Sequence, residues 1–245
     1  MEHRNVRSPA IAAWLALLVG GCVDASHGVT QCPTGPSDQA GAAAMPTCAH
    51  GTKPSDDGLI DDFEGGENQL SKVGGRDGYW FTAHDEKGST IGPSPLKVTD
   101  LVPGPGKAMH ILGQTSGDKD AWGSQLGANF VSAGMYDASK YGGISFRAKV
   151  GGKGTKKVRF KVGDVNTHPD GGVCKSCWNL FGKDMTLTGD WQEYKVTFVE
   201  MKQEAGWGDR FPAITPSKVM SVNWSFGPGQ GFDLWLDDLQ FFECL

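Results

Sequence analysis

Short runs in which apolar and polar side chains alternate are the feature that most constrains the fold of this chain. In the runs 144–150 (ISFRAKV) and 158–162 (VRFKV), every second side chain is apolar and the others are Ser, Arg or Lys. Successive side chains of a β-strand point to opposite faces. Each run is therefore predicted to be a strand with one buried face and one solvated face.

Further strands are predicted wherever similar short runs lie between Gly, Pro, Asp and Asn, namely at 61–63, 79–83, 108–112, 125–130, 185–187, 191–198, 220–226 and 232–241. We find no segment of ten or more residues with helical periodicity and caps, and the 36 glycines suit many tight turns. Many short strands without helices predict an all-β fold, a two-sheet antiparallel jelly-roll β-sandwich.

The beginning of the chain has the features of an export signal. Arg4 and Arg7 precede the apolar run 10–19, and Gly20 and Gly21 stand directly before Cys22. The apolar run is about half of the roughly 20 residues that a membrane-spanning helix needs. Residues 1–21 resemble the signal peptide of a bacterial lipoprotein, which implies lipidation of Cys22 and a membrane anchor. The alternative is ordinary cleavage near Ala25 and a soluble secreted product.

Two regions follow the signal. Residues 22–57 are rich in Gly, Ala, Pro, Ser, Thr and Asp and have almost no large apolar side chains, so they are predicted to form a disordered tether. Residues 58–245 are predicted to form the folded domain. The net charge of −5 argues against nucleic acid as a partner.

Five cysteines remain after Cys22: Cys32, Cys48, Cys174, Cys177 and Cys244. Export favours disulfides. We expect Cys32 with Cys48 to close the tether and Cys174 with Cys177 to close a tight loop, which leaves one cysteine unpaired or paired between chains. A zinc site at the second pair would need two more ligands, for which His168 and Cys244 are the only candidates.

Both ends of the predicted domain resemble a known family. The segments 60–64 (IDDFE) and 232–241 (FDLWLDDLQF), with 136–146 and 191–194 between them, resemble family 11 carbohydrate-binding modules and the related complex I intermediate-associated protein family. The resemblance covers nearly all of residues 58–245. It implies a galactose-binding-like jelly roll that binds a polysaccharide or glycan of the β-glucan kind.

The same resemblance implies a structural calcium ion where the first and last strands meet. Its ligands would be Asp62, Glu64 and Asp238, with Asp238 preferred to Asp237. Calcium takes about six to eight oxygen ligands, so backbone carbonyls or Asp61 would complete the shell. The alternative is that these acids are solvated strand ends.

Tryptophans are the candidate platforms for a sugar ring. Trp122 and Trp207 lie among small and polar residues and are the preferred platforms, although each would alternatively pack a loop onto the sheet edge. Trp224 alternates with apolar residues and is predicted to lie in the core. Trp191 is interpreted as a packing residue, and Trp178 as a cover for the Cys174–Cys177 bond.

Polar ligand contacts are expected from the outward face of one sheet, where the alternation places Arg147, Arg159, Lys161, Asn223 and Ser225. Asp164 and Asn166 end the strand that carries Arg159, and Gln203 lies near Trp207. The predicted binding residues are Trp122, Arg159, Asp164, Gln203, Trp207 and Asn223. An ordinary solvated face is the alternative.

No catalytic motif stands out. A hydrolase needs two suitably placed carboxylates, and a lyase needs a base beside a group that neutralises charge. Glu200, Glu204, His168 and Lys161 have suitable chemistry, but no motif singles them out. We therefore expect an exported, lipid-anchored protein that binds glycan at the cell envelope and is not an enzyme. The alternative is a scaffold or adhesion protein that binds another envelope protein, and a glycoside hydrolase or polysaccharide lyase is less favoured.

Overall fold

The structure is a computed structural model that describes residues 45–66, 68–101, 104–152 and 154–245. The predicted signal peptide, Cys22, Cys32 and most of the predicted tether lie outside these residues. Within the described ranges, no helix has the length and hydropathy needed to cross a membrane.

The described part of the chain has eleven strands and three short 3₁₀ helices. The strands are β1 (Thr52–Asp61), β2 (Trp80–His84), β3 (Val98–Asp100), β4 (Lys107–Gln114), β5 (Ser124–Asn129), β6 (Gly143–Val150), β7 (Lys157–Asp164), β8 (Phe181–Thr186), β9 (Gln192–Thr197), β10 (Val219–Phe226) and β11 (Gly231–Cys244). The helices are η1 (Pro169–Gly171), η2 (Phe198–Glu200) and η3 (Pro216–Lys218).

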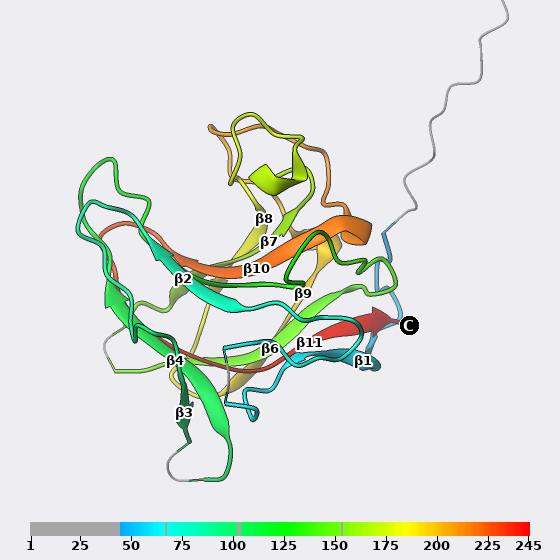
Figure 1. Cartoon of the computed structure of the whole chain (residues 1–245), viewed down its shortest axis with the longest axis horizontal. Helices are drawn as coiled ribbons and strands as arrows, with labels where there is room; N and C mark the ends of the chain where they lie inside the picture. Colours follow the sequence, from blue (N-terminus) through cyan, green and yellow to red (C-terminus); the bar gives the residue numbers. More distant parts are fainter. Residues whose placement is uncertain (1–44, 67, 102–103, 153) are drawn as a thin grey trace, which may run out of the picture. The chain divides into compact units, whose positions relative to one another are not determined.

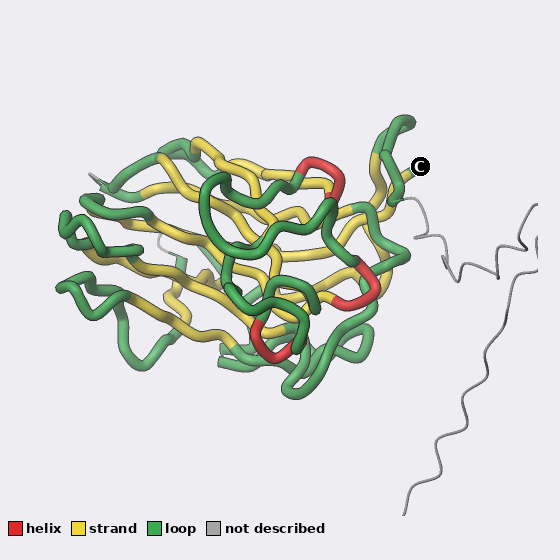
Figure 2. Tube along the Cα trace, turned by 90° about the horizontal axis from the view of Figure 1, so that it is seen from above, coloured by secondary structure: helices red, strands yellow, loops and turns green. Residues whose placement is uncertain are grey.

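The strands form two antiparallel sheets packed face to face (Figure 1). The six-stranded sheet has the order β3-β4-β11-β6-β9, with β1 also paired to β11. The five-stranded sheet has the order β2-β5-β10-β7-β8. Figure 2 shows the three helices as short red turns within the loops. The predicted two-sheet β-sandwich is confirmed.

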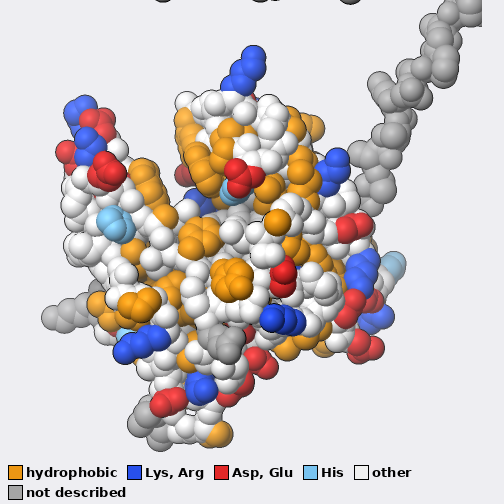
Figure 3. Space-filling model, in the orientation of Figure 1, with side chains coloured by type: hydrophobic (Ala, Val, Ile, Leu, Met, Phe, Trp, Pro, Cys, Tyr) orange, Lys and Arg blue, Asp and Glu red, His pale blue; other side chains and the backbone are white. Residues whose placement is uncertain are grey.

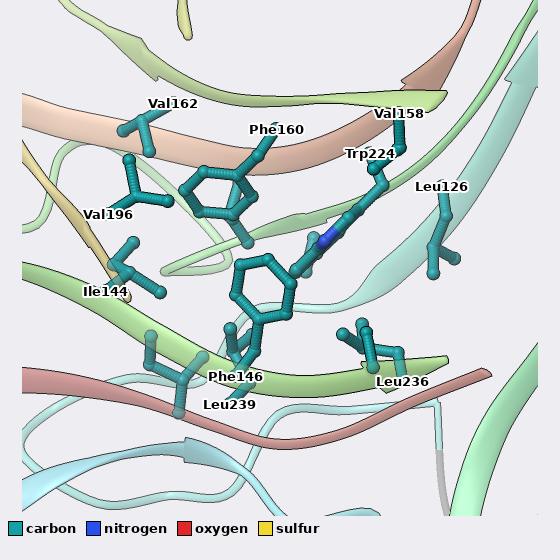
Figure 4. Packing of buried hydrophobic residues seen from close by; sticks show 14 of the residues in the cluster. Leu126, Ile144, Phe146, Val158, Phe160, Val162, Val196, Trp224, Leu236 and Leu239 are labelled. Carbon is teal, nitrogen blue, oxygen red and sulfur yellow. The ribbon is translucent and has the colours of Figure 1, made fainter. Parts of the chain in front are cut away.

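Alternation along the strands builds the core between the sheets. In β7, Val158, Phe160 and Val162 are buried, whereas Arg159 and Lys161 point to the other face. Trp224 of β10 is 0 % exposed, and its ring lies 5.2 Å from those of both Phe146 and Phe160 (Figure 4). The prediction that Trp224 is a core residue is confirmed. β3 was not predicted, because only one of its three residues, Val98, is apolar.

The folded domain begins earlier than the sequence indicates. β1 starts at Thr52, so residues 52–57 belong to a strand and the predicted boundary at residue 58 is wrong. The strand pairs with β11, and the buried Arg76 donates hydrogen bonds to the carbonyl oxygens of Asp57 (2.6 Å) and Leu59 (2.5 Å). Backbone pairing and this guanidinium order a segment whose own side chains are mostly polar.

Two disulfides are present in the described residues. Cys174–Cys177 is confirmed. Cys48 pairs with Cys244, so the expected pairing of Cys48 with Cys32 is wrong. The physical reason is that β1 pairs with the end of β11, which brings Thr52 opposite Cys244 and the preceding turn beside it. Disulfides persist in oxidising compartments, so these bonds indicate an exported protein.

Candidate functional site

A groove of about 1200 Å³ runs over the outward face of the five-stranded sheet. Strands β2, β5, β7, β8 and β10 supply its floor, and loops rise on either side; Figure 3 shows the hollow between two raised parts of the surface. The lining residues are Phe81, Ala83, Trp122, Gln125, Asn129, Lys157, Val158, Arg159, Lys161, His168, Asp170, Cys177, Trp178, Leu180, Asp184, Met185, Thr186, Glu204, Trp207, Ser225, Gly227, Pro228 and Gln230.

Three exposed tryptophans belong to this groove. Trp122 comes from the loop between β4 and β5, Trp178 from the loop between β7 and β8, and Trp207 from the segment between β9 and β10. Their exposed fractions are 51 %, 51 % and 45 %. The structure thus brings the two predicted platforms, Trp122 and Trp207, to one concave surface. Their contact with a ligand stays a prediction.

Trp178 follows the Cys174–Cys177 disulfide and forms part of the groove wall. Its backbone N–H donates to the carbonyl of Thr167 (2.9 Å), and its φ of 75° lies in the left-handed region that residues with side chains rarely adopt. The indole meets the His168 ring edge-on, with ring centroids 4.8 Å apart. Trp178 therefore stands in the groove wall with half of its surface free, next to Cys177.

The buried side-chain amides of Asn179 and Gln203 hold the wall that carries Trp207. The Asn179 amide donates to the carbonyls of Glu204 (2.9 Å) and Trp207 (2.7 Å), and its oxygen accepts from the Glu204 N–H (2.9 Å). The Gln203 amide donates to the carbonyls of Asn179 (2.7 Å) and Asp209 (2.8 Å). This clamp fixes the two loops to each other. Sequence reasoning missed Asn179, because its partners lie about 25 residues away.

Arg159 is held firmly at the floor of the groove. Its Nη1 donates to Asp184 Oδ1 (2.9 Å) and its Nη2 to the carbonyl of Lys202 (2.5 Å), while its Nε lies 4.0 Å from Glu204 Oε2. The side chain is only 14 % exposed, and its buried Nε has no hydrogen-bond partner among the described residues. Arg159 lies on the outward face of the sheet, as the alternation predicts, and its contact with a ligand stays a prediction.

Lys161 lies beside Arg159 on the same face of β7. Its Nζ donates to Gln125 Oε1 (3.3 Å). Among the described residues, no carboxylate oxygen lies within 4.0 Å of this Nζ. Burial, reinforced by the charge of Arg159 and opposed by that of Glu204, lowers the pKa of Lys161 to about 8. The floor of the groove therefore holds a poorly compensated cation.

Asp164 does not line the groove, so its expected role as a ligand at the strand end is corrected. It is 0 % exposed, and its carboxylate accepts hydrogen bonds from Thr167 N–H (3.1 Å), Thr167 Oγ1 (2.8 Å), Thr215 N–H (2.8 Å) and Asn166 Nδ2 (3.2 Å). It ties the turn after β7 to the segment before η3.

Gln203 and Asn223 are also buried, at 7 % and 1 % exposed, and neither lines the groove. Gln203 is occupied by the clamp described above. Asn223 points outward from β10, as the alternation predicts, and lies against Gly127 of β5. The Phe81 ring and Asn223 Oδ1 both lie so close to Gly127 that a Cβ on this residue would collide with each of them. The packing of Phe81 over the neighbouring strand leaves this amide inaccessible, so its predicted ligand role is wrong.

The three predicted calcium ligands have protein partners. Glu64 accepts from the backbone N–H of Lys107 (2.8 Å), Asp238 pairs with Arg147 (3.2 Å), and Asp62 accepts from the N–H of Glu64 (3.3 Å). Within the described ranges, no three His, Cys, Asp or Glu side chains form a group that would hold a metal ion. Calcium at these acids stays a prediction.

Comparison with known proteins gives structural matches only. No protein-family model matches the chain, and no curated protein matches its sequence. The family 11 carbohydrate-binding module of the cellulosomal cellulase Lic26A-Cel5E of Clostridium thermocellum matches with a TM-score of 0.56 and 17 % identity, over 79 % of this chain and 95 % of that one.

A second structure is the family 11 module from Clostridium thermocellum in complex with a β-1,3-1,4-mixed-linked tetrasaccharide. It matches with a TM-score of 0.54 and 17 % identity, over 77 % of this chain and 96 % of that one. At a sequence identity this low, the structural likeness establishes the fold alone. The relation to the complex I intermediate-associated family stays a prediction. The described domain thus has the two-sheet jelly-roll fold seen in family 11 carbohydrate-binding modules.

Proposed function

We propose that this protein binds a polysaccharide of the β-glucan kind in the groove, without catalysing a reaction on it. The observation that carries the proposal is the convergence of three exposed tryptophans on one groove, above a sheet floor that also carries polar side chains. One structure with this fold is a complex with a mixed-linked β-glucan tetrasaccharide, which supports the choice of ligand class.

The chemistry of the groove suits a sugar chain. A pyranose ring offers apolar C–H faces and an edge of hydroxyl groups, which flat aromatic rings and short polar side chains complement. Trp122 and Trp207 supply aromatic faces, and Gln125, Asn129 and Ser225 supply amide and hydroxyl groups from the floor. The groove volume of about 1200 Å³ is large enough for several sugar units.

Retardation gels with soluble β-glucans test the proposal. Stacking on an aromatic ring contributes about 1–3 kcal/mol per base in nucleic acids, and a sugar should lie at the lower end. Trp207→Ala and Trp122→Ala should therefore each weaken binding by about tenfold. Trp191→Ala is the matched control, because Trp191 contacts Arg147 and Lys149 of the six-stranded sheet.

If no glycan retards the wild-type protein, or if the control loses as much affinity as the groove variants, the scaffold or adhesion function replaces this proposal. A reducing-end assay on the same mixtures, together with absorbance of unsaturated sugars, tests the non-catalytic part. Accumulation of either product would identify a hydrolase or a lyase.

Lipid anchoring at the cell envelope is part of the proposal and is supported by the basic, apolar and small residues before Cys22. Cys22→Ala should move the protein from the membrane fraction to the soluble fraction, because anchoring depends on the acyl chains. The measurement is fractionation of cells followed by immunoblotting. Membrane association that survives the substitution would contradict the anchor.

Calcium binding by Asp62, Glu64 and Asp238 is a separate proposal, supported by their position where β1 ends beside β11. An ion that binds the folded state alone stabilises it by mass action. Adding calcium to chelator-treated protein should raise the melting temperature, and Glu64→Gln should abolish the gain. Melting curves that coincide with and without calcium would exclude the ion.

A further inference from the structure

The floor of the groove has more hydrogen-bond donors than the described residues satisfy. An ammonium carries several N–H donors, yet Lys161 Nζ has, in the described part of the chain, the single partner Gln125 Oε1, at 3.3 Å. Beside it, the Nε of Arg159 also has no hydrogen-bond partner among the same residues, but it is buried and not open to a ligand. Both side chains line the groove.

The carboxylates of the groove form no ion pair with Lys161 among the described residues, although the charge of Glu204 acts on it. Asp184 is 2.9 Å from Arg159 Nη1 and Glu204 is 4.0 Å from its Nε, so both acids are placed for the guanidinium. Within the described ranges, neither forms an ion pair with Lys161. A half-buried cation without an ion-pair partner is costly, and an acid that arrives with the ligand offsets that cost.

We propose that the groove prefers an acidic glycan, in which a uronic acid carboxylate on the sugar chain pairs with Lys161. This inference rests on the proposed function and names the substrate class of the same site. The sugar rings stack on the wall tryptophans, and the carboxylate at C6 of one unit reaches the sheet floor.

The charges around Lys161 predict the pH dependence of this preference. Arg159 lies on the same strand, Glu204 comes from the segment after β9, Asp184 from β8, and His168, whose pKa is lowered by burial, from the turn before η1. With a pKa of about 8, Lys161 is charged near neutral pH and loses its proton above that value. Affinity for the acidic glycan should fall as pH rises through this range, while affinity for a neutral glycan should not.

The experiment uses two ligands that differ only at C6. Cellohexaose and the β-1,4-linked glucuronic acid hexamer have the same linkage and ring faces, and isothermal titration of the purified full chain measures both. The acidic hexamer should bind at least about tenfold more tightly, because hydrogen bonds to charged groups are worth about twice those between neutral groups. Lys161→Met should remove this difference.

Lys195→Met is the matched control, since it removes the same charge from β9 of the other sheet and should leave the difference intact. Lys161→Gln gives a second variant, so that a folding defect in one does not decide the result. If cellohexaose binds as well as the acidic hexamer, the preference is wrong and the groove function stands. If neither hexamer nor any soluble β-glucan binds, the proposed function itself fails.

Discussion

Trp224→Ala is expected to lower the free energy of unfolding by about 3–5 kcal/mol, the usual cost of truncating a fully buried aromatic side chain. Trp224 is 0 % exposed and packs between Trp80 (6.0 Å between ring centroids), Phe146 and Phe160 (5.2 Å each). These rings come from both sheets, so the substitution leaves a cavity where the sheets meet. Chemical denaturation followed by fluorescence or circular dichroism measures the loss.

Trp207→Ala and Trp122→Ala are the controls, because about half of each side chain is already in solvent. Each should change stability far less than Trp224→Ala. Equal destabilisation by all three substitutions would show that the groove tryptophans are packing residues. The assignment of Trp207 and Trp122 to a binding surface would then be untenable.

Loss of the Cys48–Cys244 disulfide is expected to cost roughly 5 kcal/mol, since the bond closes a loop whose ends are 196 residues apart. In the chain-entropy account, a crosslink this long restricts the unfolded chain strongly. It also holds β1 against the end of β11, the two strands that close the domain. The double variant Cys48→Ser/Cys244→Ser should therefore unfold at a much lower denaturant concentration.

The other disulfide supplies the comparison. Cys174–Cys177 spans a separation of only 3 residues, so Cys174→Ser/Cys177→Ser should cost roughly 2 kcal/mol or less by the same account. Loss of this short disulfide should instead weaken glycan binding, because the bond holds the loop that carries Trp178. If both double variants lose the same free energy of unfolding, loop length does not explain how much the Cys48–Cys244 bond stabilises the fold.

The sequence predicted the positions of side chains best where the pattern within one strand is enough to decide them. The alternation in β7 separates the buried Phe160 and Val162 from the groove residues Arg159 and Lys161 without reference to any other strand. Trp122 and Trp207 are recognisable because each stands among small and polar residues that cannot bury it. These local patterns are enough to predict the sandwich fold and part of the groove.

The rest depends on contacts between distant segments, which no local pattern records. β1 resembles a tether because its side chains are polar, and its order comes from β11 and Arg76. Asp164 ends the strand β7 that carries Arg159, and Gln203 directly precedes the groove residue Glu204, but the polar atoms of both side chains hold loops in place. The pairing of Cys48 with Cys244 could not be predicted for the same reason, because the two residues are far apart in the sequence.

The central claim is that the groove of the five-stranded sheet binds glycan through Trp122 and Trp207. Isothermal titration with a mixed-linked β-glucan tetrasaccharide, on the wild-type protein and on Trp122→Ala/Trp207→Ala, tests it most directly. We predict saturable binding by the wild type and a loss of about a hundredfold in the double variant, if each ring contributes about 1.4 kcal/mol, with unchanged circular dichroism. Undiminished affinity in a folded double variant would contradict the claim.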